Sequence, residues 1–279
     1  MESIKNHLIN GLHRKPILAD VFYKADGKAK PIVIFSHGFK GFKDWGHFNL
    51  VGKAFAEAGM VFVKFNFSHN GTTVENPLEF GDLEAFGNNN YIIELDDLKL
   101  VMDWILGYEP LHDQTDPEQL FLIGHSRGGG ISVLKAAEDA RVKKLCTWAA
   151  VSDILNRNKQ RTIETWKKNG VIHARNGRTQ QDMPLYLQFY ETQLKHKERL
   201  NILKAARQLG IPFLIIHGTN DEAVSSKDAT DLRLAAAHSE LVMIDGANHT
   251  FETRHPYTDS TLTGNAELVV NRTISFFKS

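Results

Sequence analysis

Short apolar runs alternate along the chain with longer segments in which apolar residues recur at helical spacing. The short runs have the composition of strands buried on both faces: Ile32–Phe35, Val61–Phe65, Leu120–Ile123, Leu145–Ala149, Phe213–Ile216 and Leu241–Ile244. The helical patterns lie between and after them, at Phe48–Ala58, Tyr91–Leu106, Gly129–Ala140, Lys227–Ala237 and Ala266–Lys278. This alternation predicts an α/β fold, with a mostly parallel, doubly wound central sheet and crossover helices on both faces.

One segment interrupts the alternation. Residues 154–207 lie between two predicted strands and are too long for an ordinary connection. The segment has a helical pattern, a hairpin pattern around the dipeptide Asn176-Gly177 and two further helical patterns: Asn156–Asn169, Val171–Arg175 with Arg178–Gln181, Tyr186–Leu194 and Leu200–Leu209. We interpret 154–207 as a cap subdomain inserted into a single domain that spans residues 1–279.

Composition and charge narrow the class of protein. Lys and Arg together number 33, as do Asp and Glu, so the formal net charge is zero, which disfavours a protein that binds duplex nucleic acid. No apolar run approaches the length of a membrane span, and the first residues do not resemble a signal peptide. The single cysteine, Cys146, is expected in the core. We expect a cytoplasmic protein without nucleic-acid or membrane partners; a homodimer stays open.

A candidate nucleophile follows the predicted strand Leu120–Ile123. The sequence Gly124-His125-Ser126-Arg127-Gly128 fits the pattern G-x-S-x-G and precedes a helical pattern. A serine at the apex of a tight strand-to-helix turn projects its hydroxyl outward, and the flanking glycines avoid backbone collisions. The helix N-terminus adds a field that favours a developing oxyanion. The alternative is an ordinary glycine-rich turn.

Two later strand ends carry the partners that such a serine requires. Asp221 follows Phe213–Ile216, and His249 follows Leu241–Ile244. Taken alone, Asp221 is also typical of a turn and His249 of a solvated loop. The carboxyl ends of parallel strands meet at one edge of a sheet, however, and the order Ser, Asp, His on such ends predicts a nucleophile, an orienting acid and a base.

At this point the chain resembles the α/β-hydrolase superfamily, from about Ile17 to the end. The matching stretches are "SHGF", "FNFSHNG", "GHSRGG", "HGTNDEAV" and "GANHTF". Within the superfamily they are most similar to dienelactone-hydrolase-like esterases, including cinnamoyl and feruloyl esterases. The stretch Phe67–Gly71 departs from these esterases, because it carries His69 and Asn70 where small residues are frequent.

The resemblance implies a serine hydrolase that cleaves small carboxylic esters through an acyl-enzyme intermediate. Ser126 would be the nucleophile, His249 the base and later the acid, and Asp221 the orienting carboxylate. The backbone N–H groups of Phe39 and Arg127 would form the oxyanion hole. A small-molecule ester is then the expected partner.

Other acids and histidines compete for these roles. In this fold Asp153 is an alternative orienting acid, whereas Asp245 and Asp228 are expected in a turn and at a helix start. We expect His125 to pack structurally and His37 to brace its loop. The sequence contains neither H-E-x-x-H nor a Cys/His cluster, so we expect no metal and no other cofactor.

Several other side chains receive weaker predictions. In the cap, Trp166, Tyr186 and Phe189 are candidate substrate contacts, and the alternative is that they hold the cap to the main domain. The acids of the Tyr91–Leu106 helix (Glu94, Asp96 and Asp97) are expected on a solvated face. In the loop "FSHGFKGFKDW", Lys40 and Lys43 are expected in solvent, while Phe42 and Trp45 either wall the substrate entrance or pack beneath the loop.

Other functions use the same residues. A serine peptidase or a thioesterase would carry the same triad, because the choice of scissile bond depends on pocket shape. A non-catalytic protein of this fold, used for ligand binding, is less favoured because no triad member is missing.

Overall fold

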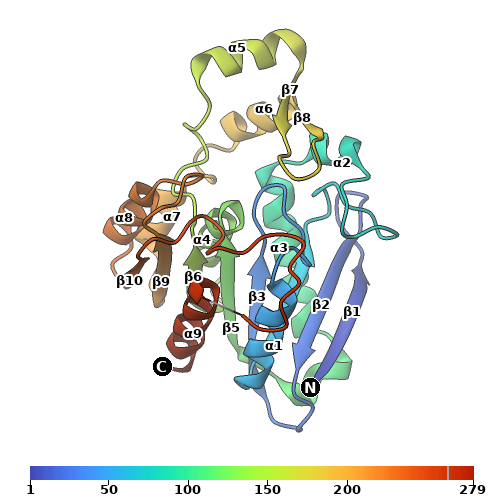
Figure 1. The fold of residues 1–279 in the computed structure, drawn as a ribbon, viewed down its shortest axis with the longest axis vertical. Coiled ribbons are helices and arrows are strands. Elements are labelled where there is room, and N and C mark those ends of the chain that lie inside the picture. The colour runs from blue at the N-terminus through green and yellow to red at the C-terminus, as the bar shows by residue number, and fades with distance from the viewer. Residues whose placement is uncertain (263) are drawn as a thin grey trace.

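A central sheet of eight strands organises the chain (Figure 1). The computed structural model describes residues 1–262 and 264–279. The sheet order is β1-β2-β4-β3-β5-β6-β9-β10. The strands span Glu2–Ile9 (β1), Ile17–Tyr23 (β2), Lys30–Ser36 (β3), Val61–Asn66 (β4), Thr115–His125 (β5), Val142–Trp148 (β6), Phe213–Gly218 (β9) and Ser239–Ile244 (β10). In this order, the neighbouring strands from β4 across to β10 pair in parallel. The pairs β1–β2 and β2–β4 are antiparallel.

Helices cover both faces of the sheet, so the predicted α/β architecture is confirmed. One face packs against α3 (Tyr91–Leu106), α4 (Arg127–Glu138), α7 (Ile202–Gln208) and α8 (Ser226–Ala235). The other face packs against α1 (Phe48–Glu57) and α9 (Gly264–Lys278). Two short helices, α2 (Leu83–Asn88) and the 3-10 helix Glu109–Gln114, complete the main body. Strands buried on both faces need apolar residues at every position, which explains the continuous apolar runs.

The six predicted strands are all present, but the pattern missed the hairpin formed by β1 and β2. Strand β1 lies at the edge of the sheet and is mostly exposed, so its sequence lacks a strong apolar signal. Strand β2 is buried along nearly its whole length. Its polar residue, Asp20, interrupts the apolar run that would otherwise have marked it.

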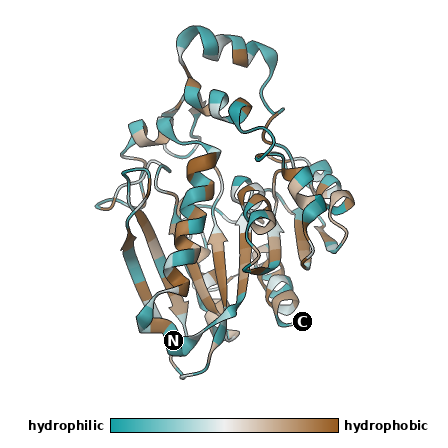
Figure 2. Cartoon of the chain, turned by 180° about the vertical axis from the view of Figure 1, so that it is seen from behind, coloured by the Kyte–Doolittle hydropathy of each residue, from teal (hydrophilic) through white to brown (hydrophobic). Residues whose placement is uncertain are grey.

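The inserted segment rises above the carboxyl ends of the parallel strands (Figure 1). It comprises α5 (Gln160–Asn169), the hairpin β7 (Val171–Arg175) and β8 (Asp182–Tyr186), and α6 (Leu187–Lys195). The second hairpin strand begins four residues later than the sequence predicted, because residues 176–181 form the turn. Figure 2 shows that α5 is largely hydrophilic, and Trp166 is its only buried residue. Helix α7, by contrast, packs beside the sheet against α4 and α8.

The prediction that the acids of α3 face solvent is wrong for two of the three. Glu94 and Asp97 are buried, and Asp96 is half-buried beside His13. The carboxylate of Asp97 accepts a hydrogen bond from the backbone N–H of Ser68, in the loop after β4. Burial raises the pKa of Asp97 to about 7.

This raised pKa predicts a measurable pH dependence of stability. Between the ordinary value of 3.8 and about 7 the folded state holds a proton on Asp97 that the unfolded chain releases. The free energy of unfolding therefore falls as the pH rises through this range. For Asp97→Asn this contribution disappears. Between pH 5 and pH 8, the free energy of unfolding of the wild type should fall by about 2–3 kcal/mol more than that of the variant, as measured by urea unfolding. If the free energies of unfolding of the two proteins change with pH in parallel, the prediction is wrong.

Candidate active site

Ser126 occupies a strained turn between β5 and α4. Its backbone has φ 56° and ψ −119°, a conformation that residues with a side chain rarely adopt. The turn is possible because of the flanking glycines. A Cβ on Gly124 would lie 2.2 Å from the carbonyl oxygen of Gly128, and a Cβ on Gly128 would lie 2.3 Å from that of Ser36. The predicted strand–turn–helix element is therefore present, and it pushes the serine hydroxyl away from the backbone.

The structure brings Ser126, His249 and Asp221 together from three loops. Nε2 of His249 lies 3.1 Å from the hydroxyl oxygen of Ser126, and Nδ1 lies 2.8 Å from Oδ2 of Asp221. Asp221 follows β9 and His249 follows β10, at the carboxyl edge of the sheet. These distances fit a histidine that donates a hydrogen bond to the carboxylate through Nδ1 and accepts one from the serine through Nε2.

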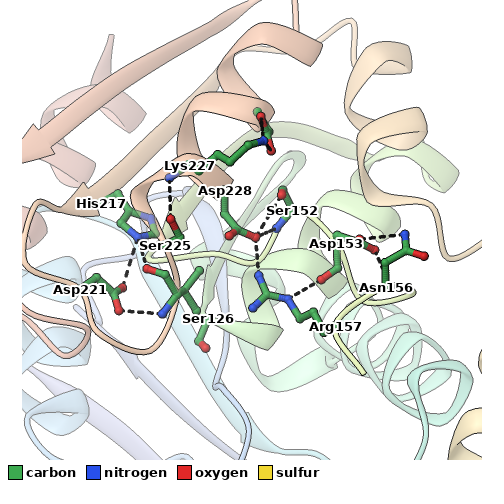
Figure 3. A network of polar contacts seen from close by, with 12 residues as sticks. Ser126, Ser152, Asp153, Asn156, Arg157, His217, Asp221, Ser225, Lys227 and Asp228 are labelled. Atoms are coloured by element: carbon green, nitrogen blue, oxygen red, sulfur yellow. Dashed lines mark hydrogen bonds and ion pairs between the residues drawn. The ribbon is translucent and has the colours of Figure 1, made fainter. Parts of the chain in front are cut away.

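Asp221 is held by more donors than the sequence predicted (Figure 3). Its Oδ1 accepts hydrogen bonds from the backbone N–H groups of Ala223 and Val224, and its Oδ2 lies 3.2 Å from Nε2 of His217. The same nitrogen of His217 lies 3.0 Å from the carbonyl oxygen of Val224. Both neighbours are acceptors, so Nε2 carries a proton. His217 was missed as a site residue, although it stands inside the quoted stretch "HGTNDEAV".

These contacts set the charge of Asp221. Burial by itself would raise the pKa of this carboxyl group, but the hydrogen bonds from His217 and His249 and the backbone N–H of Val224 outweigh it. Together they hold the pKa of Asp221 well below its ordinary range. The group is thus ionised at neutral pH and able to stabilise positive charge on His249.

A cavity of about 200 Å³ opens beside Ser126 and His249. Its lining comes from the loop after β3, the start of α1, the serine turn, the His249 loop and the tip of the cap hairpin: Gly38, Phe39, Lys40, Gly41, Trp45, Phe48, His125, Ser126, Asn176, His249 and Thr250. Trp45 lines this cavity, whereas Phe42 is fully buried.

The loop after β3 passes close to the side chain of Ser126. A Cβ on Gly38 would lie 3.0 Å from the Cβ of Ser126. This close approach is possible because Gly38 has no side chain, and it brings the following residue, Phe39, near Ser126. Arg127 directly follows Ser126 in the sequence. His37 braces the loop, because its Nδ1 lies 2.9 Å from the carbonyl oxygen of Gly38. Burial lowers the pKa of His37 to about 4, so it is neutral at pH 7.

A family model described as the α/β hydrolase fold matches residues 88–253, more than half of the chain, including Ser126, Asp221 and His249. The chain belongs to the α/β hydrolase fold family. The family assignment from the quoted motifs is thereby confirmed, and it supports a hydrolase. A search of curated proteins gave no match.

Solved structures resemble this α/β hydrolase over nearly its whole length. Est1E from Butyrivibrio proteoclasticus, solved with ferulic acid bound, is 19% identical with a TM-score of 0.73, covering 98% of both chains. The α/β hydrolase GrgF from Penicillium sp. sh18 is 16% identical with a TM-score of 0.74, covering 100% of this chain and 98% of that one. A dienelactone hydrolase from Anabaena variabilis is 18% identical with a TM-score of 0.64, covering 99% and 97%. At these identities the similarity concerns the fold.

The cap aromatics of this α/β hydrolase lie elsewhere than the sequence predicted. Trp166, Tyr186 and Phe189 are not among the residues that line the cavity at Ser126. Trp166 donates its indole N–H to the carbonyl oxygen of Leu185, and the Tyr186 hydroxyl lies 2.5 Å from Glu84 of α2. Phe189 packs on Tyr91 of α3. Their rings hold the cap to itself and to the main domain, which is the alternative that the sequence left open.

The competing acids contact other groups. Asp153 accepts hydrogen bonds from the backbone N–H groups of Leu155 and Asn156, and Asp228 accepts them from Ser152 and Arg157 (Figure 3). Asp245 lies beside the hydroxyl of Thr219. In the described part of the chain, Asp221 is thus the carboxylate that the geometry sets against Nδ1 of His249.

His125, the other histidine of the serine turn, supports His249 from the side. Its Nε2 donates to the backbone carbonyl oxygen of His249, and the two rings lie 4.8 Å apart. Burial lowers the pKa of His125 to about 3, which keeps this ring neutral.

The described residues contain no group of three or more His, Cys, Asp or Glu side chains that could hold a metal ion. None of the helices in residues 1–262 and 264–279 has the length and apolar character needed to cross a membrane.

The close contact at Gly128 gives a direct test of the serine turn. Gly128→Ala would place a methyl group 2.3 Å from the Ser36 carbonyl oxygen and 2.4 Å from that of His37. We expect the free energy of unfolding to fall by about 3 kcal/mol or more in urea titrations. Gly210→Ala is the matched control, because nothing lies within 4 Å of its added methyl group. Equal stability of the two variants would contradict the proposed crowding.

Proposed function

We propose that this α/β hydrolase is a serine esterase that cleaves small carboxylic esters through an acyl-enzyme intermediate. The hydrogen-bonded series Ser126–His249–Asp221 carries the proposal. Each member has the contact that its role requires, and the serine faces a cavity that can receive a substrate.

In the proposed reaction, Ser126 attacks the ester carbonyl carbon while His249 takes the hydroxyl proton through Nε2. Asp221 stabilises the imidazolium that forms. The backbone N–H groups of Phe39 and Arg127 donate hydrogen bonds to the oxyanion of the tetrahedral intermediate. His249 then gives its proton to the departing alcohol. Water attacks the acyl-enzyme with the same histidine as base, which releases the acid and regenerates the serine hydroxyl.

The cavity supports a small substrate. Its volume of about 200 Å³ is below the roughly 300–1,000 Å³ of sites for larger ligands. Three aromatic residues, Phe39, Trp45 and Phe48, are among its lining residues, as is Asn176 from the cap hairpin. These features favour a short acyl or aryl group over a long lipid chain.

Replacing triad members tests the chemistry. Ser126→Ala should lower kcat for a p-nitrophenyl ester by a factor of about 10⁴ or more, because the nucleophile is gone. Asp221→Asn should lower it by about 10⁴, since His249 loses its orienting carboxylate. Asp153→Asn is the matched control and should keep nearly the full rate. If Asp221→Asn keeps nearly the full kcat and Asp153→Asn loses it, the orienting carboxylate is Asp153 and not Asp221.

A substrate panel separates esters from the alternatives. The purified protein is given p-nitrophenyl acetate and butyrate, a cinnamoyl ester, a lactone, a thioester and an aminoacyl anilide, with Ser126→Ala as the blank. We expect the highest kcat/KM among the oxygen esters. Preference for the thioester or the anilide would indicate a thioesterase or a peptidase. Failure of a fluorophosphonate to label Ser126 would indicate a protein that only binds ligands.

A further inference from the structure

The side chain of Arg127 extends from the serine turn to Phe39, in the loop after β3. Its guanidinium carbon lies 4.0 Å from the centre of the Phe39 ring. It also lies 5.1 Å from the Tyr91 ring and 5.2 Å from the Phe189 ring. The side chain is only 13% exposed, so these contacts are largely shielded from water. The attraction between a cation and an aromatic face is stronger when water is excluded.

A buried carboxylate holds the other side of this guanidinium. Oε1 of Glu94, on α3, lies 3.3 Å from an Arg127 nitrogen and accepts a second hydrogen bond of 2.8 Å from the side chain of Asn89. The side chain of Glu94 is 3% exposed. Such a buried acid is costly without a cation nearby, so Glu94 and Arg127 fix one another.

The Phe39 ring packs against Arg127 and Phe86. Its centre lies 4.0 Å from the guanidinium carbon of Arg127 and 5.5 Å from the centre of the Phe86 ring. Both residues that carry the proposed oxyanion donors are therefore joined through their side chains. Arg127 supplies one donor from its own backbone, and its guanidinium packs on the ring of the residue that supplies the other.

We propose that the Arg127 side chain, anchored by Glu94, is a positioning group that sets the geometry of the oxyanion hole by fixing Phe39. The inference rests on the proposed function, because it concerns the stabilisation of the tetrahedral intermediate. Arg127→Met keeps the length of the side chain and the backbone donor, but it removes the cation and its bond to Glu94. Arg127→Lys keeps the charge but loses the flat surface that stacks on Phe39.

Two measurements report on the stabilisation of the oxyanion: kcat/KM for an ester and the affinity for a ketone inhibitor. For Arg127→Met we expect kcat/KM to fall by about 10- to 100-fold, since a misdirected donor costs less than a missing one. The affinity for an alkyl trifluoromethyl ketone, which forms an oxyanion on reaction with Ser126, should fall by the same factor. Arg127→Lys should show a smaller but parallel loss of both.

Two pairs of variants separate positioning from general instability. Glu94→Gln keeps the oxygen that accepts from Arg127 and Asn89, so it should remain within about 3-fold of wild type, whereas Glu94→Ala should resemble Arg127→Met. Arg178→Met is the matched control. Arg178 also lies over aromatic rings, those of Phe42 and Phe80, and pairs with Glu79, but it is not a cavity-lining residue. It should leave the ketone affinity within about 3-fold.

The outcomes distinguish this inference from the function on which it rests. If the wild type hydrolyses esters and Arg127→Met keeps both kcat/KM and ketone affinity within about 3-fold, the positioning role is wrong. A fall in kcat/KM without a matching loss of ketone affinity would also overturn it. If the wild type hydrolyses no ester and takes up no fluorophosphonate at Ser126, the proposed function itself fails, and the positioning role fails with it.

Discussion

The candidate site depends on how closely three stretches of backbone approach one another at the carboxyl end of β5. The Ser126 turn is tight enough that a Cβ on Gly124 or Gly128 would lie within 2.4 Å of a backbone atom, and Gly38 passes close to the Ser126 side chain. Glycine at these positions lets the proposed nucleophile, Ser126, lie close to both proposed oxyanion donors. The strained φ of Ser126 is maintained because the strand on one side and the helix on the other are both well packed.

Buried charges stabilise the loop that carries Phe39. Lys43 was expected in solvent, but its ammonium group lies 2.8 Å from Asp20 and 2.5 Å from Asp44. Lys64 reaches the same two carboxylates and donates to the backbone carbonyl oxygen of Lys43. Burial lowers the pKa of Lys64 to about 8, even though both acids oppose this shift. Removing one member would leave an unpaired buried charge, so the group constrains the loop as a unit.

The sequence predicted those features whose signals are local, and it missed those that depend on distant partners. Ser126, Asp221 and His249 each follow an apolar strand, and the common direction of parallel strands was enough to place them at one edge. The burial of Glu94 and Lys43 had no such signal. In the sequence each resembles an ordinary surface charge. In the fold Glu94 lies beside Arg127 and Lys43 beside Asp20, and these partners are distant in the sequence. Likewise, β1 is an exposed edge strand, and its mixed composition hid it.

The inserted segment contacts the loop that carries Phe39, and this contact relates the segment to the proposed chemistry. Lys40, next to Phe39, donates to the backbone carbonyl oxygen of Arg175 at the end of β7, and the following residue, Asn176, lines the cavity. Phe189 of the cap lies near the same guanidinium that packs on Phe39. Phe189 therefore reaches Phe39 only through Arg127, while Asn176 at the hairpin tip lines the cavity directly. A movement of the inserted segment would change the cavity wall at Asn176 and the position of the loop that carries Phe39 together. Under the proposed function, substrate binding and stabilisation of the oxyanion would therefore depend on one another.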